Sequence, residues 1–210
     1  MSNTVIFDVD STIVTIEGLY EIGRHKGFDK EISEITSQGN MGDISFNESI
    51  VRRVEIIQPS MEDMVWLSDY YLDHLTDGVQ EVVKFLHEKG IYIHLISGSF
   101  KDALYGLQEV LGLDEKHVHA NELIFDESGK YAGFDLTQLL ANNNGKAKVI
   151  QMLNLEPKSV FVGDGYTDME VKDVVDIFVG FGGVVERSIV KTSADRYIYD
   201  LTDMIELVQD

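Results

Sequence analysis

Cysteine is absent from the 210 residues of this chain. A disulfide scaffold, a zinc site built on thiolates and a cysteine nucleophile are therefore excluded. Long apolar runs are also missing, because the longest candidate, residues 174–185, is interrupted by Asp176 and three glycines. A membrane-spanning helix needs roughly 20 apolar residues, so we expect no membrane partner. Residues 1–10 have neither a basic start nor a long apolar core, so we expect no secretory signal and a cytoplasmic protein.

Basic residues are scarce, since 17 Lys and Arg stand against 37 Asp and Glu, and the net charge is -20. A surface this acidic repels phosphate backbones, which argues against nucleic acid as a partner. If the substrate is itself an anion, a metal ion or a few placed cations must meet its charge locally. The oligomeric state stays open.

The first part of the chain changes from one strand to a long helical stretch. The apolar fraction of 44% is ordinary for a globular protein, and the length suits one domain with a small insertion. Thr4–Phe7 is a short, β-rich apolar run that predicts a buried strand. Residues 17–74 show only helical patterns, with a capping box at 45–48 and a further helix start at Ser60.

After residue 76, strands alternate with helices, which predicts a parallel sheet covered on both faces. The predicted fold class is α/β, a doubly wound and mostly parallel sheet of Rossmann type, with a small all-helical cap inserted after the first strand. We predict a core at residues 1–14 and 76–210 and a cap at 15–75. The predicted helices are 78–89 with Asp77 as the N-cap, 100–111, 146–153 and 167–174. The predicted strands are 91–96, 118–120, 123–126, 131–134, 159–162 and 177–179, followed by helix, strand and helix.

Ligands of such sheets lie beyond the carboxyl ends of the strands, and an acidic pair stands at the first of these ends. Asp8 and Asp10 follow the strand directly, and side chains two apart leave a strand on the same side. On spacing alone, a turn with an Asx cap is the better explanation of this pair. Its place at a strand end favours a functional role.

Three more strand ends carry polar groups. Ser97 and Gly98 precede a helix, where hydroxyls and free amides bind anions, although a plain N-cap is the commoner case. Lys146 opens a helix, where a cation is disfavoured unless an anion lies nearby, although a solvated surface lysine explains it equally well. Asp164, flanked by glycines at a strand end, suits Mg²⁺ coordination or a simple turn and cap. Together the four ends supply a nucleophile, an acid, anion clamps and a metal site, which is what phosphoryl transfer to an aspartate requires.

These blocks, in this order, resemble the haloacid dehalogenase superfamily of phosphohydrolases, and within it the eukaryotic branch that acts on O-phospho-L-serine. The similarity runs through nearly the whole chain. The stretches that carry it are DVDST at 8–12, IIQPS at 56–60, LISGSF at 95–100, YAGFD at 131–135, GKAKVI at 145–150, GDGYTDME at 163–170 and GFGGVVE at 180–186.

The resemblance implies a Mg²⁺-dependent phosphomonoester hydrolase with a small-molecule substrate. Asp8 would be the nucleophile and Asp10 the general acid and base. Asp8, the backbone carbonyl of Asp10, and Asp164 would hold Mg²⁺, while Asp168 would support the metal shell and Lys146. The residues that would contact the phosphoryl group or the substrate from the core are Ser97, Gly98, Lys146 and Thr167.

The same resemblance assigns three cap residues to the substrate. Glu17 would bind an ammonium group, Arg53 would grip a carboxylate, and Phe46 would form an apolar wall. Without the resemblance, a purely structural role is the simpler explanation for each of these residues. Glu17 could face a helix dipole, Phe46 could only pack, and Arg53 could be a solvated partner of Glu48.

Two positions depart from the family pattern. Asn40, followed by Met41, stands where the family commonly has Met, so the cap loop shifts or the pocket is more polar. The family's Ser-Gly-Gly is here Ser97-Gly98-Ser99, and we expect little effect from the change.

The leading hypothesis is hydrolysis of O-phospho-L-serine to L-serine through an aspartyl-phosphate, a step of serine biosynthesis. A second hypothesis keeps the chemistry but changes the substrate to another small phosphorylated amine, acid or alcohol. A third is a receiver-like signalling protein that is phosphorylated on Asp and lacks turnover. The helical insertion of some sixty residues and the acid at Asp10 argue against this third reading.

Overall fold

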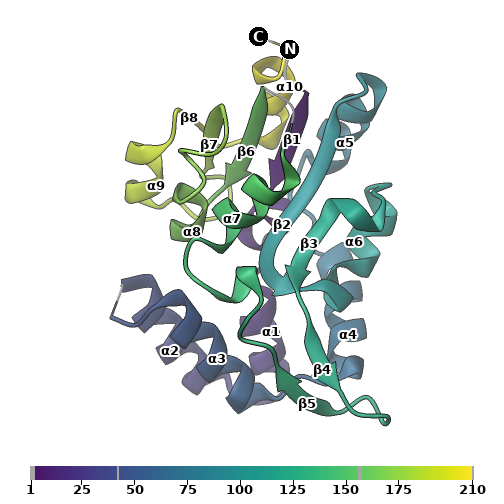
Figure 1. Ribbon diagram of the computed structural model, residues 1–210, viewed down its shortest axis with the longest axis vertical. Helices are drawn as coiled ribbons and strands as arrows, with labels where there is room; N and C mark the ends of the chain where they lie inside the picture. The colour runs from purple at the N-terminus through teal and green to yellow at the C-terminus, as the bar shows by residue number, and fades with distance from the viewer. Residues whose placement is uncertain (1–2, 42, 156–157, 210) are drawn as a thin grey trace.

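The computed structural model describes residues 3–41, 43–155 and 158–209. Its centre is a six-stranded sheet in the order β3-β2-β1-β6-β7-β8, and every pairing in it is parallel (Figure 1). The predicted α/β class and parallel sheet are therefore confirmed. The strands of the sheet are β1 (Thr4–Phe7), β2 (Tyr92–Phe100), β3 (Val118–Asn121), β6 (Ser159–Gly163), β7 (Ile177–Phe181) and β8 (Arg196–Ile198).

Strand β1 lies in the middle of the sheet, where Phe7 pairs with Leu95 of β2 and Val162 of β6. All four residues of β1 are buried. A continuous apolar run is typical of a parallel strand that is covered on both faces. The chain therefore delivers residue 8 to the centre of the sheet's carboxyl edge.

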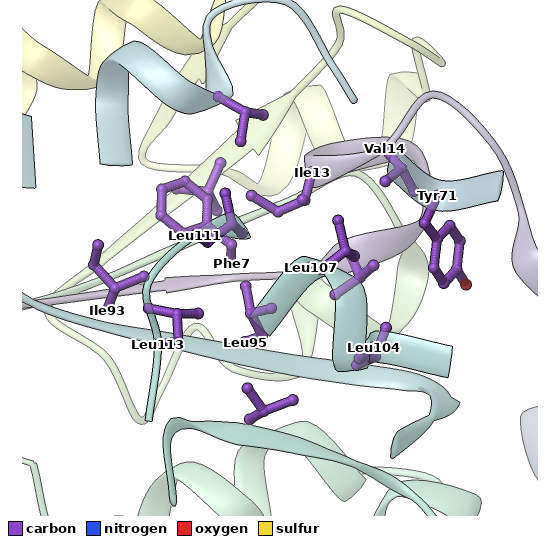
Figure 2. Close-up of a cluster of buried hydrophobic side chains, with 14 of the residues drawn as sticks. Phe7, Ile13, Val14, Tyr71, Ile93, Leu95, Leu104, Leu107, Leu111 and Leu113 are labelled. Carbon is purple, nitrogen blue, oxygen red and sulfur yellow. The ribbon is translucent and has the colours of Figure 1, made fainter. Parts of the chain in front are cut away.

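Helices cover both faces, as a doubly wound fold requires. One face, with Phe7 and Leu95, packs against Leu107 and Leu111, as Figure 2 shows. The other face, with Ile6, packs against helices on the opposite side. The helices of the core are α5 (Val79–Glu88), α6 (Tyr105–Val110), α7 (Gly145–Leu153), α8 (Tyr166–Met169), α9 (Ser188–Ser193) and α10 (Met204–Leu207).

Four helices follow β1 before the chain re-enters the core near residue 76, which confirms the predicted helical stretch. Two short chain segments join them to the core: Thr15 N donates to His74 O at 2.8 Å, and Thr76 N donates to Ile13 O at 2.9 Å. In Figure 1 these helices lie below the sheet, beyond the end at which β1 finishes. They are α1 (Gly18–His25), α2 (Asp29–Met41), α3 (Phe46–Ile57) and α4 (Met61–Leu72).

An antiparallel hairpin, β4 (Leu123–Phe125) and β5 (Tyr131–Phe134), also reaches these helices. Its turn contacts the start of α4, because Met61 N donates to Gly129 O at 2.9 Å. The hairpin thus lies beside the cap, although the sequence division groups it with the core. The boundaries at residues 14, 15, 75 and 76 stay a prediction.

Three local predictions were wrong at the ends of elements. The N-cap of helix α5 is Gly78, with a positive φ of 85°, rather than the predicted Asp77. Strand β2 continues to Phe100, where it pairs with Asn121, so the predicted helix begins later. Helix α8 ends at Met169, and residues up to 174 form turns instead. Among the helices of the described ranges, none is long and apolar enough to cross a bilayer.

Candidate active site

The loop after β1 places two carboxylates at the carboxyl edge of the sheet. Asp8 N donates to Val162 O at 2.9 Å, which continues the strand pairing up to this residue. The chain then turns sharply, with Ser11 at a φ of 54°. Asp8 is 8% exposed. The turn therefore holds the buried Asp8 and the partly buried Asp10 at one place.

Lys146 lies between two buried carboxylates. Its Nζ is 2.6 Å from Asp8 Oδ1 and 2.6 Å from Asp168 Oδ1. The second oxygen of Asp168 accepts from Gly165 N at 2.8 Å, so Asp168 is held at both ends. Burial opposes the charge of Lys146, but the two carboxylates outweigh it and raise the pKa of the ammonium above its usual value. The predicted cation at the start of α7 therefore does have anions beside it.

Glycine is required where α7 begins. A Cβ on Gly145 would collide with the backbone at Leu139, since the helix start passes directly over that turn. The preceding residue, Asn144, takes a positive φ of 58°. This close packing fixes the first turn of α7 and thereby the position of Lys146.

Three carboxylates are close enough to share a cation. Ligand oxygens of Asp8, Asp164 and Asp168 lie within 4.8 Å of one another, and all three residues are buried. Asp164 Oδ1 accepts from Thr12 Oγ1 at 3.4 Å, and its Oδ2 forms an ion pair with Arg187. Buried carboxylates in such a group need positive charge, and hard oxygen donors are the ligands that Mg²⁺ prefers. The donor set therefore fits a divalent cation.

Asp10 is partly buried against the cap. Tyr71 of α4 donates its hydroxyl to Asp10 Oδ1 at 2.6 Å. Burial, and then the carboxylates of Glu17 and Asp8, raise the pKa of Asp10 to about 8, while the bond from Tyr71 opposes the rise. At neutral pH the Asp10 carboxyl thus carries a proton in this state of the site.

The end of β2 presents a hydroxyl whose direction is set by the backbone. Ser97 Oγ accepts from Ser99 N at 3.0 Å, so its own proton is free to be donated elsewhere. Asn121 Nδ2 donates to Gly98 O at 2.9 Å and holds the same turn from β3. Phe46 lies directly on Gly98, where a Cβ would come within 2.9 Å of the ring.

The cap residues Glu17 and Arg53 lie toward the same centre. Glu17 Oε1 accepts from Ser11 Oγ at 2.9 Å and is 3.7 Å from Arg187 Nη2. Arg53 donates its Nε to Ser49 O at 3.2 Å. Burial lowers the pKa of Arg53, and the charges of Glu17 and Asp10 oppose this shift. Arg53 is therefore electrostatically linked to both carboxylates.

A pocket joins the cap to the core. Phe46 of α3 meets Gly98, Lys146 and Thr167 there, so four of the predicted residues share one surface. The remaining lining residues are Leu140, Asn142, Gly145 and Glu170. Asn47 closes one side by donating its Nδ2 to Ala141 O at 2.8 Å.

The sequence reasoning missed Tyr71, Arg187 and Asn121. Arg187 follows the end of β7, so the rule about strand ends, applied to that loop, would have found it. Tyr71 is 61 residues from Asp10 and stands in an ordinary helical pattern, which gives no signal. The side chain of Asn40, the expected departure in the cap, lies outside the described residues.

Comparison with known proteins identifies the family of this chain. Residues 3–171 match the family model described as haloacid dehalogenase-like hydrolase, and the chain belongs to this family. Within it, the chain is 39% identical to the phosphoserine phosphatase of Bos taurus over 212 residues, which cover 100% of this chain and 94% of the relative. It stands among the phosphoserine phosphatases of that family.

Solved structures agree with this placement. A phosphoserine phosphohydrolase-like protein from Francisella tularensis has a TM-score of 0.87 at 27% identity, covering 98% of this chain and 99% of the other. A structure described as a phospho-aspartyl intermediate analogue of phosphoserine phosphatase has a TM-score of 0.83 at 27% identity, with 98% of each chain covered.

Proposed function

We propose that this protein hydrolyses O-phospho-L-serine to L-serine and inorganic phosphate through a phosphoryl group carried on Asp8. The observation that carries the proposal is the position of Lys146, 2.6 Å from both Asp8 and Asp168 at the centre of the sheet edge. A buried carboxylate beside a fixed cation is a nucleophile placed where a phosphate dianion can be neutralised. The similarity over the full chain supports the substrate.

The carboxylate cluster fits Mg²⁺, and we assign its ligands as Asp8, Asp164 and the backbone carbonyl of Asp10. Asp168 is the third member of the cluster, and its two oxygens accept from Lys146 Nζ and Gly165 N. It therefore holds Lys146 in place. When bound, Mg²⁺ supplies positive charge against the oxygens of the transferred phosphoryl group.

In the first step, a carboxylate oxygen of Asp8 attacks phosphorus and the bond from phosphorus to the serine oxygen breaks. Asp10 donates its proton to that oxygen, which would otherwise leave as a strongly basic alkoxide. Burial keeps this proton on Asp10 at neutral pH by raising the pKa of the carboxyl to about 8. Lys146, Ser97 and the amide of Gly98 bind the phosphoryl oxygens.

In the second step, Asp10 is ionised and takes a proton from a water molecule. The water oxygen attacks phosphorus, the acyl-phosphate bond breaks, and Asp8 returns as a carboxylate with inorganic phosphate as product. The two carboxylates thus need opposite protonation states at the start of the cycle. Closure of the cap limits the access of bulk water to the site.

Recognition of the serine part falls to the cap. Arg53 binds the carboxylate, because the planar fork of a guanidinium matches two carboxylate oxygens. Glu17 binds the ammonium group, while Phe46 covers the apolar side and Thr167 lies next to the phosphate. In a chain of net charge -20, an anionic substrate depends on these few cations.

A substrate panel with and without metal tests the proposal. We expect phosphate release from O-phospho-L-serine with Mg²⁺, loss of activity in excess chelator, and recovery when Mg²⁺ is restored. Full turnover in chelator would contradict the metal site. Preference for another phosphomonoester would contradict the serine assignment and leave the strand-end chemistry standing. Phosphorylation of the protein without turnover would instead favour a receiver-like role.

A further inference from the structure

Tyr71 joins the cap to two groups of the core. It lies in the last part of α4, and its side chain is fully buried. Its hydroxyl is 2.6 Å from Asp10 Oδ1 and 3.0 Å from Ser99 Oγ. Ser99 is the residue that replaces a family glycine, and its side chain is also buried.

The direction of this hydrogen-bond chain follows from counting protons. Tyr71 has one hydroxyl proton, and the bond to Asp10 Oδ1 uses it. In the contact between Tyr71 and Ser99, the serine must therefore be the donor. The chain runs from Ser99 to Tyr71 to Asp10 and ends on one chosen oxygen of the carboxyl group.

The surroundings hold the tyrosine in this position. Its ring packs at the edge of the hydrophobic cluster next to Val14, and the hydroxyl oxygen points away from that cluster (Figure 2). Gly18 leaves the space that the hydroxyl fills, since a Cβ there would overlap Tyr71 Oη. Packing holds the ring, and the space at Gly18 admits the hydroxyl. A side chain held in this way can orient its hydrogen-bond partner closely.

Building on the proposed function, we propose that Tyr71, set by Ser99, is the positioning residue for the acid Asp10. By donating to Oδ1, and with a backbone hydrogen bond from Gly18 to the same carboxyl group, it fixes the plane of that group so that Oδ2 delivers the proton to the leaving group. The serine at position 99 thus acts on the acid through Tyr71. Tyr71 itself transfers no proton in this scheme.

The test uses Tyr71→Phe, which keeps the ring in its packing and removes only the hydroxyl. The readout is kcat/KM across phosphomonoesters whose leaving groups range from nitrophenol to phenol to serine. Poor leaving groups depend most on the acid, so the loss should grow along this series. We expect about tenfold or more for kcat on O-phospho-L-serine, less than about threefold on nitrophenyl phosphate, and KM within about twofold of the wild type.

Two further variants separate positioning from packing. Ser99→Ala should lower kcat in the same pattern but less strongly, and adding it to Tyr71→Phe should change nothing further, because Ser99 acts only through the tyrosine. Tyr70→Phe is the matched control. Tyr70 is the neighbour on α4 whose hydroxyl accepts from Arg24 Nη2 at 3.1 Å, so its loss should leave kcat unchanged.

Equal losses of Tyr71→Phe on all leaving groups, a change in KM alone, or no change would overturn the inference. If the losses caused by Ser99→Ala and Tyr71→Phe multiply in the double variant, Ser99 does not act through Tyr71 and its proposed role is overturned. Failure of the proposed function looks different, because the wild type would then hydrolyse aryl phosphates but not O-phospho-L-serine. The dependence on aryl leaving groups would still decide the role of Tyr71 in that case.

Discussion

Arg53→Ala tests how the protein reads the serine part of its substrate. Arg53 stands in α3, between Phe46 and the end of the helix, and its charge interacts with Glu17 and Asp10. Among the described residues, Nε is the guanidinium nitrogen with a hydrogen-bond partner, Ser49 O. The fork of the guanidinium is therefore open to a substrate carboxylate.

The expected loss of activity follows from the ion pair that Arg53 forms with the substrate carboxylate in the proposed complex. Removing one partner of a buried charge pair costs about 2–5 kcal/mol. At about 1.4 kcal/mol for each factor of ten, kcat/KM on O-phospho-L-serine should fall by roughly two orders of magnitude or more. Nitrophenyl phosphate has no carboxylate for Arg53 to bind, so its hydrolysis should fall far less.

The assay is steady-state phosphate release from both substrates, with Arg52→Ala as the matched control. Arg52 is the next residue, and its ion pair with Glu48 at 3.5 Å is exposed on both sides, so its loss should have little effect. If Arg53→Ala loses both substrates in parallel, Arg53 is structural and the serine assignment fails. The strand-end chemistry would survive that result.

Two further predictions concern stability. Lys146→Met should lower the free energy of unfolding by about 3–5 kcal/mol in chelator, because it leaves Asp8 and Asp168 buried without their cation. Thermal unfolding measures this loss, with Lys148→Met at an exposed position as the control. Equal melting temperatures of the two variants would contradict the prediction. Burial and two neighbouring histidines lower the pKa of His94 to about 4. The unfolded chain then takes up the proton first, near pH 6.5, so stability is lost as the pH falls from about 6.5 toward 4. His94→Leu should flatten this part of the unfolding curve, and parallel curves would refute the reasoning.

Much of the fold can be predicted from the sequence, because the apolar runs are short, continuous and separated by turns. Strand β1 was predicted with its observed bounds, and the helical stretch after it was confirmed. Element ends were less predictable. Gly78 and the pairing of Phe100 with Asn121 depend on the surrounding structure rather than on local propensity.

The residues of the site also differ in how far the sequence predicts their positions. The strand-end rule predicts that Asp8, Lys146 and Asp168 meet, since all three follow or adjoin the carboxyl edge of one sheet. Contacts between the cap and the core are different. Tyr71 reaches Asp10 because of how four helices pack, and no spacing in the chain encodes that approach. The roles assigned to the eleven predicted site residues stay predictions.

The most direct test of the central claim is to trap the phosphoryl group during turnover. The protein would be mixed with O-phospho-L-serine and Mg²⁺, quenched in acid within one turnover, and mapped by peptide mass spectrometry. The account predicts one added phosphoryl group on the peptide that contains Asp8, and none in Asp8→Asn, which keeps nearly the same shape. A phosphoryl group on another residue, or turnover by Asp8→Asn at the wild-type rate, would contradict it.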